Sequence, residues 1–155
     1  MRYRVCKAFE IESGHMLSKH PSRCRYPHGH SRRVEVVVSS EALDGHDMVC
    51  DFKAIKLTIE AYLDRLDHAM LINRADPALP ALRESGVGER LIELDEDPTT
   101  EVLARLIYEH VGARMMSPEP VTDRGEVEYR FPPGIRLERV RVSETSTSWA
   151  EYGRE

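Results

Sequence analysis

The densest group of chemically capable side chains lies between residues 15 and 30. His28 and His30 are two residues apart and enter a segment whose alternation predicts a strand. Because side chains alternate between the two faces of a strand, both imidazoles should lie on one face and reach a single metal ion. His15 lies just beyond an earlier predicted strand, which could bring it alongside. Three His ligands with one open position are typical of catalytic zinc, whereas structural zinc sites have four protein ligands.

Cys24 lies four residues before His28, between Arg23 and Arg25. Nearby cations stabilise a thiolate, so Cys24 is a candidate for proton transfer. It is equally a candidate for a fourth zinc ligand, which would close the site, and the residues alone leave both roles open. Without Cys24 and His15, the His pair would be interpreted as surface residues at a loop–strand junction.

Two acidic side chains have notable neighbours. Asp67 precedes His68 at the end of a predicted helix, and such a carboxylate can fix the imidazole tautomer. Alternatively, His68 only stabilises the helix C-terminus. Glu144 shares the parity of the apolar Val140 and Val142, so its carboxylate needs a partner. That partner is either a structural Arg or a ligand with two adjacent N–H donors, which a carboxylate binds with both oxygens.

The same N-terminal region is locally basic. No acidic residue lies between Glu12 and Glu35, in a chain with 22 Lys and Arg against 27 Asp and Glu. Such a stretch indicates either an anionic ligand, for example a phosphate, or an ordinary solvated face. The basic residues in it are Lys19, Arg23, Arg25, Arg32 and Arg33.

Hydrophobic periodicity predicts the elements that must position these residues. Residues 51–66 repeat at helical spacing, and a second helix should begin near Asp97, with Asp97 as its N-cap. Strands are expected at residues 2–11, 32–40, 48–50 and 137–144. Strands near both ends of the chain, interrupted by helices, are typical of the α+β class.

Length and composition exclude several classes of protein. The chain has 155 residues with 41% hydrophobic and 32% charged residues, so residues 1–155 are expected to form a single domain. No apolar run approaches the roughly 20 residues that span a bilayer. The three Cys residues form no disulfide framework, and no signal segment is expected, which favours the cytoplasm. The net charge of −5 argues against a nucleic-acid partner.

Taken together, the motifs resemble the 6-pyruvoyl-tetrahydropterin synthase / 6-carboxy-5,6,7,8-tetrahydropterin synthase family. The three-residue gap between Cys24 and His28 is similar to the bacterial carboxy type, whereas the animal enzymes have a longer gap. The matching segments occur in family order and span nearly the whole chain: Phe9-Glu-Ile-Glu-Ser-Gly-His15, Cys24-x3-His28-Gly-His30, Val49-Cys-Asp51-Phe52, Leu66-Asp67-His68, Pro98-Thr99-Thr100-Glu101 and Val142-Ser-Glu144-Thr145.

This resemblance implies the tunnelling fold (T-fold), an antiparallel four-stranded sheet with two helices on one face. It also implies a homo-oligomer, typically a homohexamer, with active sites between subunits. Three His residues would bind Zn²⁺, and three other residues would be catalytic. Glu144 would anchor the pterin, with Thr99 and Thr100 nearby. The zinc ligands would be His15, His28 and His30, and the catalytic residues Cys24 and the proton-relay dyad Asp67 and His68.

The implied reaction converts 7,8-dihydroneopterin triphosphate to 6-carboxy-5,6,7,8-tetrahydropterin, with release of acetaldehyde and triphosphate, on the route to queuosine. One alternative is formation of 6-pyruvoyl-tetrahydropterin or a related side-chain cleavage. A non-catalytic protein that binds pterins or purines on the same scaffold is an alternative of another class. The partner is then a small pterin triphosphate, with neither nucleic acid nor membrane involved.

Two features depart from the family pattern. Ser13-Gly14 stands where the family usually has Ala-Ala, and residues 74–97 and 115–134 look like insertions. Each insertion contains a short strand-prone run, Arg90–Leu94 in the first and Val127–Phe131 in the second. We expect these two runs to pair with each other as a two-stranded ribbon outside the four-stranded core.

Overall fold

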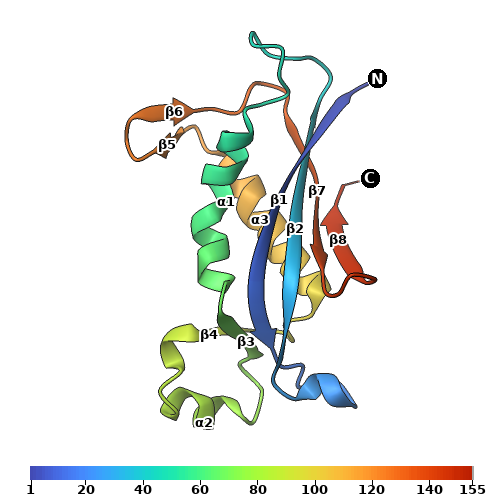
Figure 1. Cartoon of the computed structure of the whole chain (residues 1–155), viewed down its shortest axis with the longest axis vertical. Coiled ribbons are helices and arrows are strands. Elements are labelled where there is room, and N and C mark those ends of the chain that lie inside the picture. Colours follow the sequence, from blue (N-terminus) through green and yellow to red (C-terminus); the bar gives the residue numbers. More distant parts are fainter. Residues whose placement is uncertain (155) are drawn as a thin grey trace.

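A six-stranded sheet forms the centre of the structure, a computed structural model that describes residues 1–154 (Figure 1). The strand order is β4-β3-β1-β2-β7-β8. Antiparallel pairing joins β1 to β2, β2 to β7 and β7 to β8, whereas β3 and β4 are added in parallel next to β1. The strands are β1 (Tyr3–His15), β2 (His28–Ser40), β3 (Ala69–Asn73), β4 (Leu91–Leu94), β7 (Arg136–Ser143) and β8 (Trp149–Gly153).

Two long helices, α1 (Phe52–Leu66) and α3 (Thr100–Met116), lie on one face of this sheet (Figure 1). Between helices and sheet lies the main core, where Val34, Ile59 and Ile107 have no exposed surface. The α+β class and the two helices on one face are therefore confirmed, although two parallel strands extend the antiparallel core. The other helical elements are short: α2 (Leu79–Glu84) and the 3-10 turns Arg23–Arg25 and Gly88–Arg90.

The hairpin of β1 and β2 is longer than the sequence indicated. Its pairing continues past the apolar positions, so that His15 is the last residue of β1 and His28 is the first of β2. The two are directly paired across the strands, as are Ser13 and His30. Backbone pairing does not require apolar side chains, which is why alternation of hydrophobic residues underestimates the length of both strands.

The predicted pairing of Arg90–Leu94 with Val127–Phe131 is wrong. Residues Leu91–Leu94 pair with β3, in the register Met70 to Leu91. The two-stranded sheet that does exist joins β5 (Val121–Asp123) to β6 (Val127–Tyr129). Arg124 and Gly125 between them have φ of 48° and 78°, as in a tight hairpin turn. Closing this short loop costs less chain entropy than joining segments more than 30 residues apart.

Two smaller predictions also fail. The residues Met48–Cys50 form no strand, because Asp44 accepts hydrogen bonds from the backbone N–H groups of His46 and Met48 and folds the segment into a loop. Asp97 is not the N-cap of the second long helix. That helix begins at Thr100 with Thr99 as its N-cap, whose hydroxyl accepts from the Val102 N–H at 3.3 Å.

Strands β3 and β8 were not anticipated from the sequence, since both are short and lie next to turns. The final predicted strand matches β7, which ends at Ser143 and leaves Glu144 immediately beyond it. Within residues 1–154, no helix is both long enough and apolar enough to cross a bilayer.

Candidate metal centre

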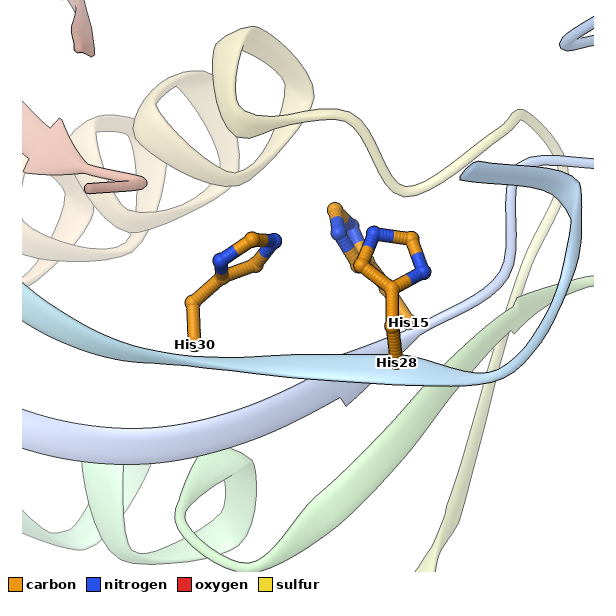
Figure 2. A group of neighbouring side chains, drawn as sticks. All are labelled: His15, His28 and His30. Atoms are coloured by element: carbon orange, nitrogen blue, oxygen red, sulfur yellow. The ribbon is translucent and has the colours of Figure 1, made fainter. Parts of the chain in front are cut away.

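Three His side chains converge at the end of the β1–β2 hairpin where the connecting loop joins the two strands, on the face that carries the helices. Figure 2 shows the imidazoles of His15, His28 and His30 pointing toward one another above the two strands. The ring centroids of His15 and His28 are 4.4 Å apart, and each lies 5.2 Å from that of His30. One potential ligand atom from each ring lies within 4.8 Å of the others. The three residues could therefore hold a metal ion.

Backbone carbonyls determine which ring nitrogens remain available. Nδ1 of His15 lies 2.7 Å from the carbonyl oxygen of Pro98, and Nδ1 of His28 lies 2.7 Å from that of Tyr26. A carbonyl oxygen only accepts, so each Nδ1 carries the proton and each Nε2 keeps a lone pair. Within residues 1–154, Nε2 of His28 and Nε2 of His30 are buried and have no hydrogen-bond partner. These buried nitrogens without a partner fit a metal ion that prefers nitrogen ligands, such as Zn²⁺.

The local electrostatics keep the imidazoles of His15 and His30 neutral. Burial lowers the pKa of His15 to about 4, although the hydrogen bond to Pro98 opposes this shift. Burial also lowers the pKa of His30, and the nearby positive charge of Arg32 adds to the effect. Neutral imidazole is the form that binds metal, so at neutral pH no proton has to leave these two rings first.

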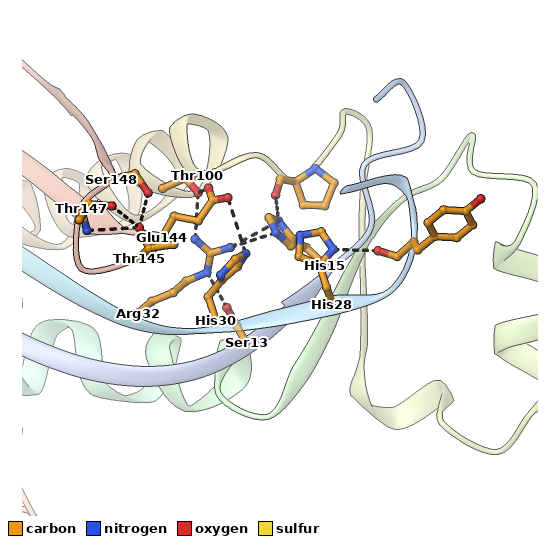
Figure 3. Close-up of polar contacts among 12 residues, drawn as sticks. Ser13, His15, His28, His30, Arg32, Thr100, Glu144, Thr145, Thr147 and Ser148 are labelled. Carbon is orange, nitrogen blue, oxygen red and sulfur yellow. Dashed lines mark hydrogen bonds and ion pairs between the residues drawn. The ribbon is translucent and has the colours of Figure 1, made fainter. Parts of the chain in front are cut away.

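Glu144 lies beside this cluster, just after the end of β7 (Figure 3). Its Oε1 is 3.6 Å from Nε2 of His30, and its Oε2 accepts a hydrogen bond from the Thr100 hydroxyl. Burial raises the pKa of this carboxyl, but the Thr100 hydroxyl, Arg32 and His30 outweigh burial, and the pKa is lowered overall. Glu144 is therefore ionised at neutral pH and is held against the first turn of α3.

A buried arginine completes the cluster and was not recognised in the sequence as part of it. Arg32 is only 2% exposed, and its guanidinium donates to the hydroxyls of Ser13 and Thr100 at 2.9 Å each (Figure 3). The alternation of residues along the strand could have indicated its burial, because Arg32 lies on the same strand face as Val34, Val36 and Val38. Arg33 points to the opposite face, where it pairs with Glu35 at 3.0 Å.

The basic stretch does not form one surface. Arg32 is buried on the face of the sheet that packs against the helices, and Arg33 lies on the opposite, exposed face. The remaining three cations, Lys19, Arg23 and Arg25, are exposed in the loop that joins β1 to β2.

Cys24 belongs to the same loop, in the 3-10 turn Arg23–Arg25, and is partly buried. Its carbonyl accepts from the N–H of Leu17, which fastens the loop two residues after His15. In the described part of the chain, the group of potential metal ligands consists of the three His residues and does not include Cys24.

Asp67 and His68 pair with each other, but on the other side of the sheet. Oδ2 of Asp67 is 2.9 Å from Nδ1 of His68, and its Oδ1 accepts from the Glu12 N–H at 2.8 Å. Both bonds lower the pKa of Asp67, the Glu12 N–H most. His68 lines a cavity of about 590 Å³ together with Glu12 and Ser31. The side chains of Glu12 and Ser31 alternate along the strands with those of Ser13 and His30, which also border the cavity. The cavity opens on the face to which Glu12 and Ser31 point, opposite the imidazoles of the His cluster.

Comparison with known proteins identifies relatives that match the whole chain. Residues 4–155 match the model of the family described as 6-pyruvoyl tetrahydropterin synthase. A 6-carboxy-5,6,7,8-tetrahydropterin synthase from Aquifex aeolicus is 30% identical over the full length of both chains. An enzyme with the same name from Haemophilus influenzae is 25% identical and covers 97% of this chain and 98% of its own.

Solved structures show the same fold. An uncharacterized protein from Wolinella succinogenes superimposes with a TM-score of 0.80 and 23% identity, covering 100% of this chain and 99% of its own. The 6-pyruvoyl tetrahydropterin synthase of Caenorhabditis elegans gives a TM-score of 0.64 with 18% identity, covering 100% and 97%. The expected T-fold is thereby confirmed. The chain belongs to the 6-pyruvoyl tetrahydropterin synthase family, a family of lyases that act on pterin side chains.

Proposed function

We propose that this protein is a zinc-dependent 6-carboxy-5,6,7,8-tetrahydropterin synthase. Its substrate would be 7,8-dihydroneopterin triphosphate, and the other products would be acetaldehyde and triphosphate. The observation that carries the proposal is the position of the ionised Glu144 beside the cluster of three His residues, with its Oε1 3.6 Å from Nε2 of His30. The names of the relatives from Aquifex aeolicus and Haemophilus influenzae support the carboxy product.

Glu144 would bind the pterin ring through its 2-amino group and the N3 hydrogen. Its Oε2 already accepts from Thr100, but a carboxylate oxygen has two lone pairs, so both oxygens can still accept from the ring. The rigid start of α3 holds this carboxylate, with Thr99 as the N-cap and Thr100 following it. The substrate side chain would then extend toward His15, His28 and His30, where bound zinc would act as a Lewis acid on its oxygens.

Proton transfer would involve Cys24 and the Asp67–His68 dyad. Asp67 remains ionised and orients the His68 ring through Nδ1, which leaves Nε2 for an incoming proton. Within one chain, however, the dyad and the His cluster lie on opposite faces of the sheet. This separation supports active sites between subunits, where one chain contributes the metal ligands and a neighbour contributes the dyad. We propose a homohexamer as the assembly.

The cellular setting follows from the same proposal. The three Cys residues are all free thiols, which suits a reducing cytoplasm. The carboxylated pterin would feed the route to queuosine.

Product analysis tests the reaction. Zinc-loaded protein is incubated with 7,8-dihydroneopterin triphosphate, and every product is identified by mass. Acetaldehyde and 6-carboxy-5,6,7,8-tetrahydropterin in equal amounts are expected. Loss of triphosphate without cleavage of the side chain would instead identify a 6-pyruvoyl-tetrahydropterin synthase. Binding of the pterin without any product would identify a non-catalytic protein.

Mixing two inactive variants tests the shared active site. His28→Ala lacks a metal ligand and His68→Ala lacks the proton-relay imidazole, so each alone should be inactive. When the two are unfolded and refolded together, some interfaces combine an intact cluster with an intact dyad, and part of the activity should return. If mass analysis finds mixed oligomers but activity stays absent, the sites are not shared between chains.

A further inference from the structure

Arg32 is a charged side chain that the proposed reaction does not use, although it lies within the metal centre. It is 2% exposed and stands on β2 two residues after His30. Within residues 1–154, no carboxylate lies within ion-pair distance of its guanidinium. An arginine keeps its proton in proteins, so this is a buried positive charge without a direct counter-ion. Such a charge is costly, and its retention needs a reason.

One nitrogen of the Arg32 guanidinium lies against the face of the His15 ring. This nitrogen, Nη2, is 3.4 Å from Nδ1 and 3.4 Å from Nε2 of that ring. A donor equidistant from both nitrogens within the ring plane would collide with Cε1, so Nη2 lies over the ring face. Nδ1 already carries the proton that it donates to the Pro98 carbonyl, so it cannot accept from Arg32. A contact between a guanidinium N–H and the ring face needs no lone pair from the imidazole.

On its other side, the guanidinium of Arg32 is linked to Glu144 through the hydroxyl of Thr100. Nη1 of Arg32 donates to Oγ1 of Thr100 at 2.9 Å, and a guanidinium can only donate hydrogen bonds. The single proton of the Thr100 hydroxyl must therefore point to Oε2 of Glu144, which it meets in a hydrogen bond. Nε of Arg32 donates to Oγ of Ser13 at 2.9 Å, and this bond fixes the orientation of the guanidinium plane. The positive charge thus reaches the carboxylate by way of Thr100 (Figure 3).

We infer that Arg32 is a positioning residue that orients Glu144 through Thr100 and so sets the affinity of the site for the pterin ring. Arg32 directs the Thr100 hydroxyl toward Oε2, and this leaves Oε1 and the second lone pair of Oε2 facing the ligand. The same guanidinium contacts the ring of His15, so one side chain would couple the carboxylate that binds the pterin to the candidate metal ligands. The inference rests on the proposed function, because it takes the pterin as the ligand of Glu144.

Arg32→Met tests this inference, with neopterin as a fluorescent probe for binding to zinc-loaded and to zinc-free protein. Methionine keeps most of the stem and removes the buried charge, a replacement that proteins often tolerate. We expect the dissociation constant for neopterin to rise roughly tenfold, as for loss of one charge-assisted hydrogen bond. The zinc content should stay at one per chain. Arg33→Met is the matched control, because the neighbouring side chain lies on the opposite face, and its affinity should equal that of the wild type.

Thr100→Val provides the second arm and leaves the arginine in place. It should weaken neopterin binding to a similar extent, and Thr100→Ser should keep the wild-type affinity. The double variant Arg32→Met/Thr100→Val should be little worse than either single variant, since both break one link. Wild-type affinity in Arg32→Met, or strictly additive effects in the double variant, would overturn the inference. Failure of the wild-type protein to bind neopterin would instead overturn the proposed function.

Discussion

The carbonyl oxygen of Pro98 lies 2.7 Å from Nδ1 of His15, and this contact joins the segment before α3 to the end of β1. It assigns the proton to Nδ1 and leaves Nε2 of His15 available for a metal. Pro98 follows Asp97, a residue that is only 8% exposed. The Asp97 carboxylate accepts hydrogen bonds from the Ser18 hydroxyl at 2.6 Å, the Lys19 N–H at 2.8 Å and the Asn73 amide at 2.8 Å. One buried acid therefore places the carbonyl that orients a candidate metal ligand.

Asp97→Ala should destabilise the protein by about 2–4 kcal/mol, because it leaves one buried and two partly buried donors without their acceptor. The denaturant midpoint of the metal-free protein measures this loss. Zinc affinity should fall as well, since the Pro98 carbonyl is no longer held against His15. Asp95→Ala is the control, because the Asp95 side chain is 87% exposed, and its effect should stay below about 0.5 kcal/mol. Equal midpoints for the two variants would contradict the anchoring role of Asp97.

His28→Ala should abolish metal retention and turnover. The wild type is expected to bind one zinc per chain, and removing one of three ligands leaves too few for stable binding. Metal analysis after dialysis against a weak chelator gives the content of each protein. His46→Ala, a change in an exposed loop, should retain one zinc. Full zinc content in His28→Ala would remove His28 from the ligand set.

Cys24→Ala should retain zinc and lose turnover. The three imidazoles remain in this variant, so the metal content should not change, whereas the proposed proton transfer is lost. Turnover of 7,8-dihydroneopterin triphosphate and zinc content are measured on the same sample. Cys6→Ala serves as the control because Cys6 is an exposed residue of β1. Joint loss of zinc and activity would show instead that the Cys24 thiolate is a ligand.

Glu144→Gln should weaken pterin binding by more than tenfold while zinc and fold stay intact. The amide keeps the shape of the carboxylate but replaces one acceptor with a donor, and each charge-assisted hydrogen bond is worth about 1.5–3 kcal/mol. Neopterin fluorescence titration measures the affinity. Glu151→Gln on the edge strand β8 should bind neopterin like the wild type. Unchanged affinity in Glu144→Gln would exclude Glu144 from the ring site.

The metal-free protein should lose stability as the pH falls from about 6.5 toward 4. His15 has a pKa of about 4 in the folded protein, against about 6.5 in an unfolded chain. Between these two pKa values, His15 is protonated in the unfolded chain but neutral in the folded protein, so protonation favours unfolding. One such proton contributes at most about 1.4 kcal/mol per pH unit. Above pH 6.5 this contribution to the pH dependence vanishes.

Urea unfolding at pH 7, 6 and 5 in the presence of a chelator measures this dependence. His15→Gln has no titrating ring at that position and should show a shallower slope across the interval. Identical slopes for the two proteins would mean that burial of His15 does not govern the acid sensitivity.

The sequence by itself determined that two of the candidate metal ligands, His28 and His30, lie on the same face of the sheet. The two-residue spacing of His28 and His30 places both on one strand face, whatever surrounds them. The apolar repeats of residues 51–66 and 102–111 likewise determined the two long helices, because helical periodicity is a local property of the chain. The family motifs are also short and local, so they could be recognised before any contact was known.

Only the tertiary structure decided which distant residues meet. In the sequence, Arg32 was one of five basic residues between Glu12 and Glu35, and its burial against Thr100 depends on how α3 docks on the sheet. The opposite faces of the His cluster and of the Asp67–His68 dyad follow from the pairing of β3 beside β1. Strand Leu91–Leu94 joined β3 rather than the segment near residue 127, because strand partners are selected by packing over long sequence separations, which local patterns do not encode.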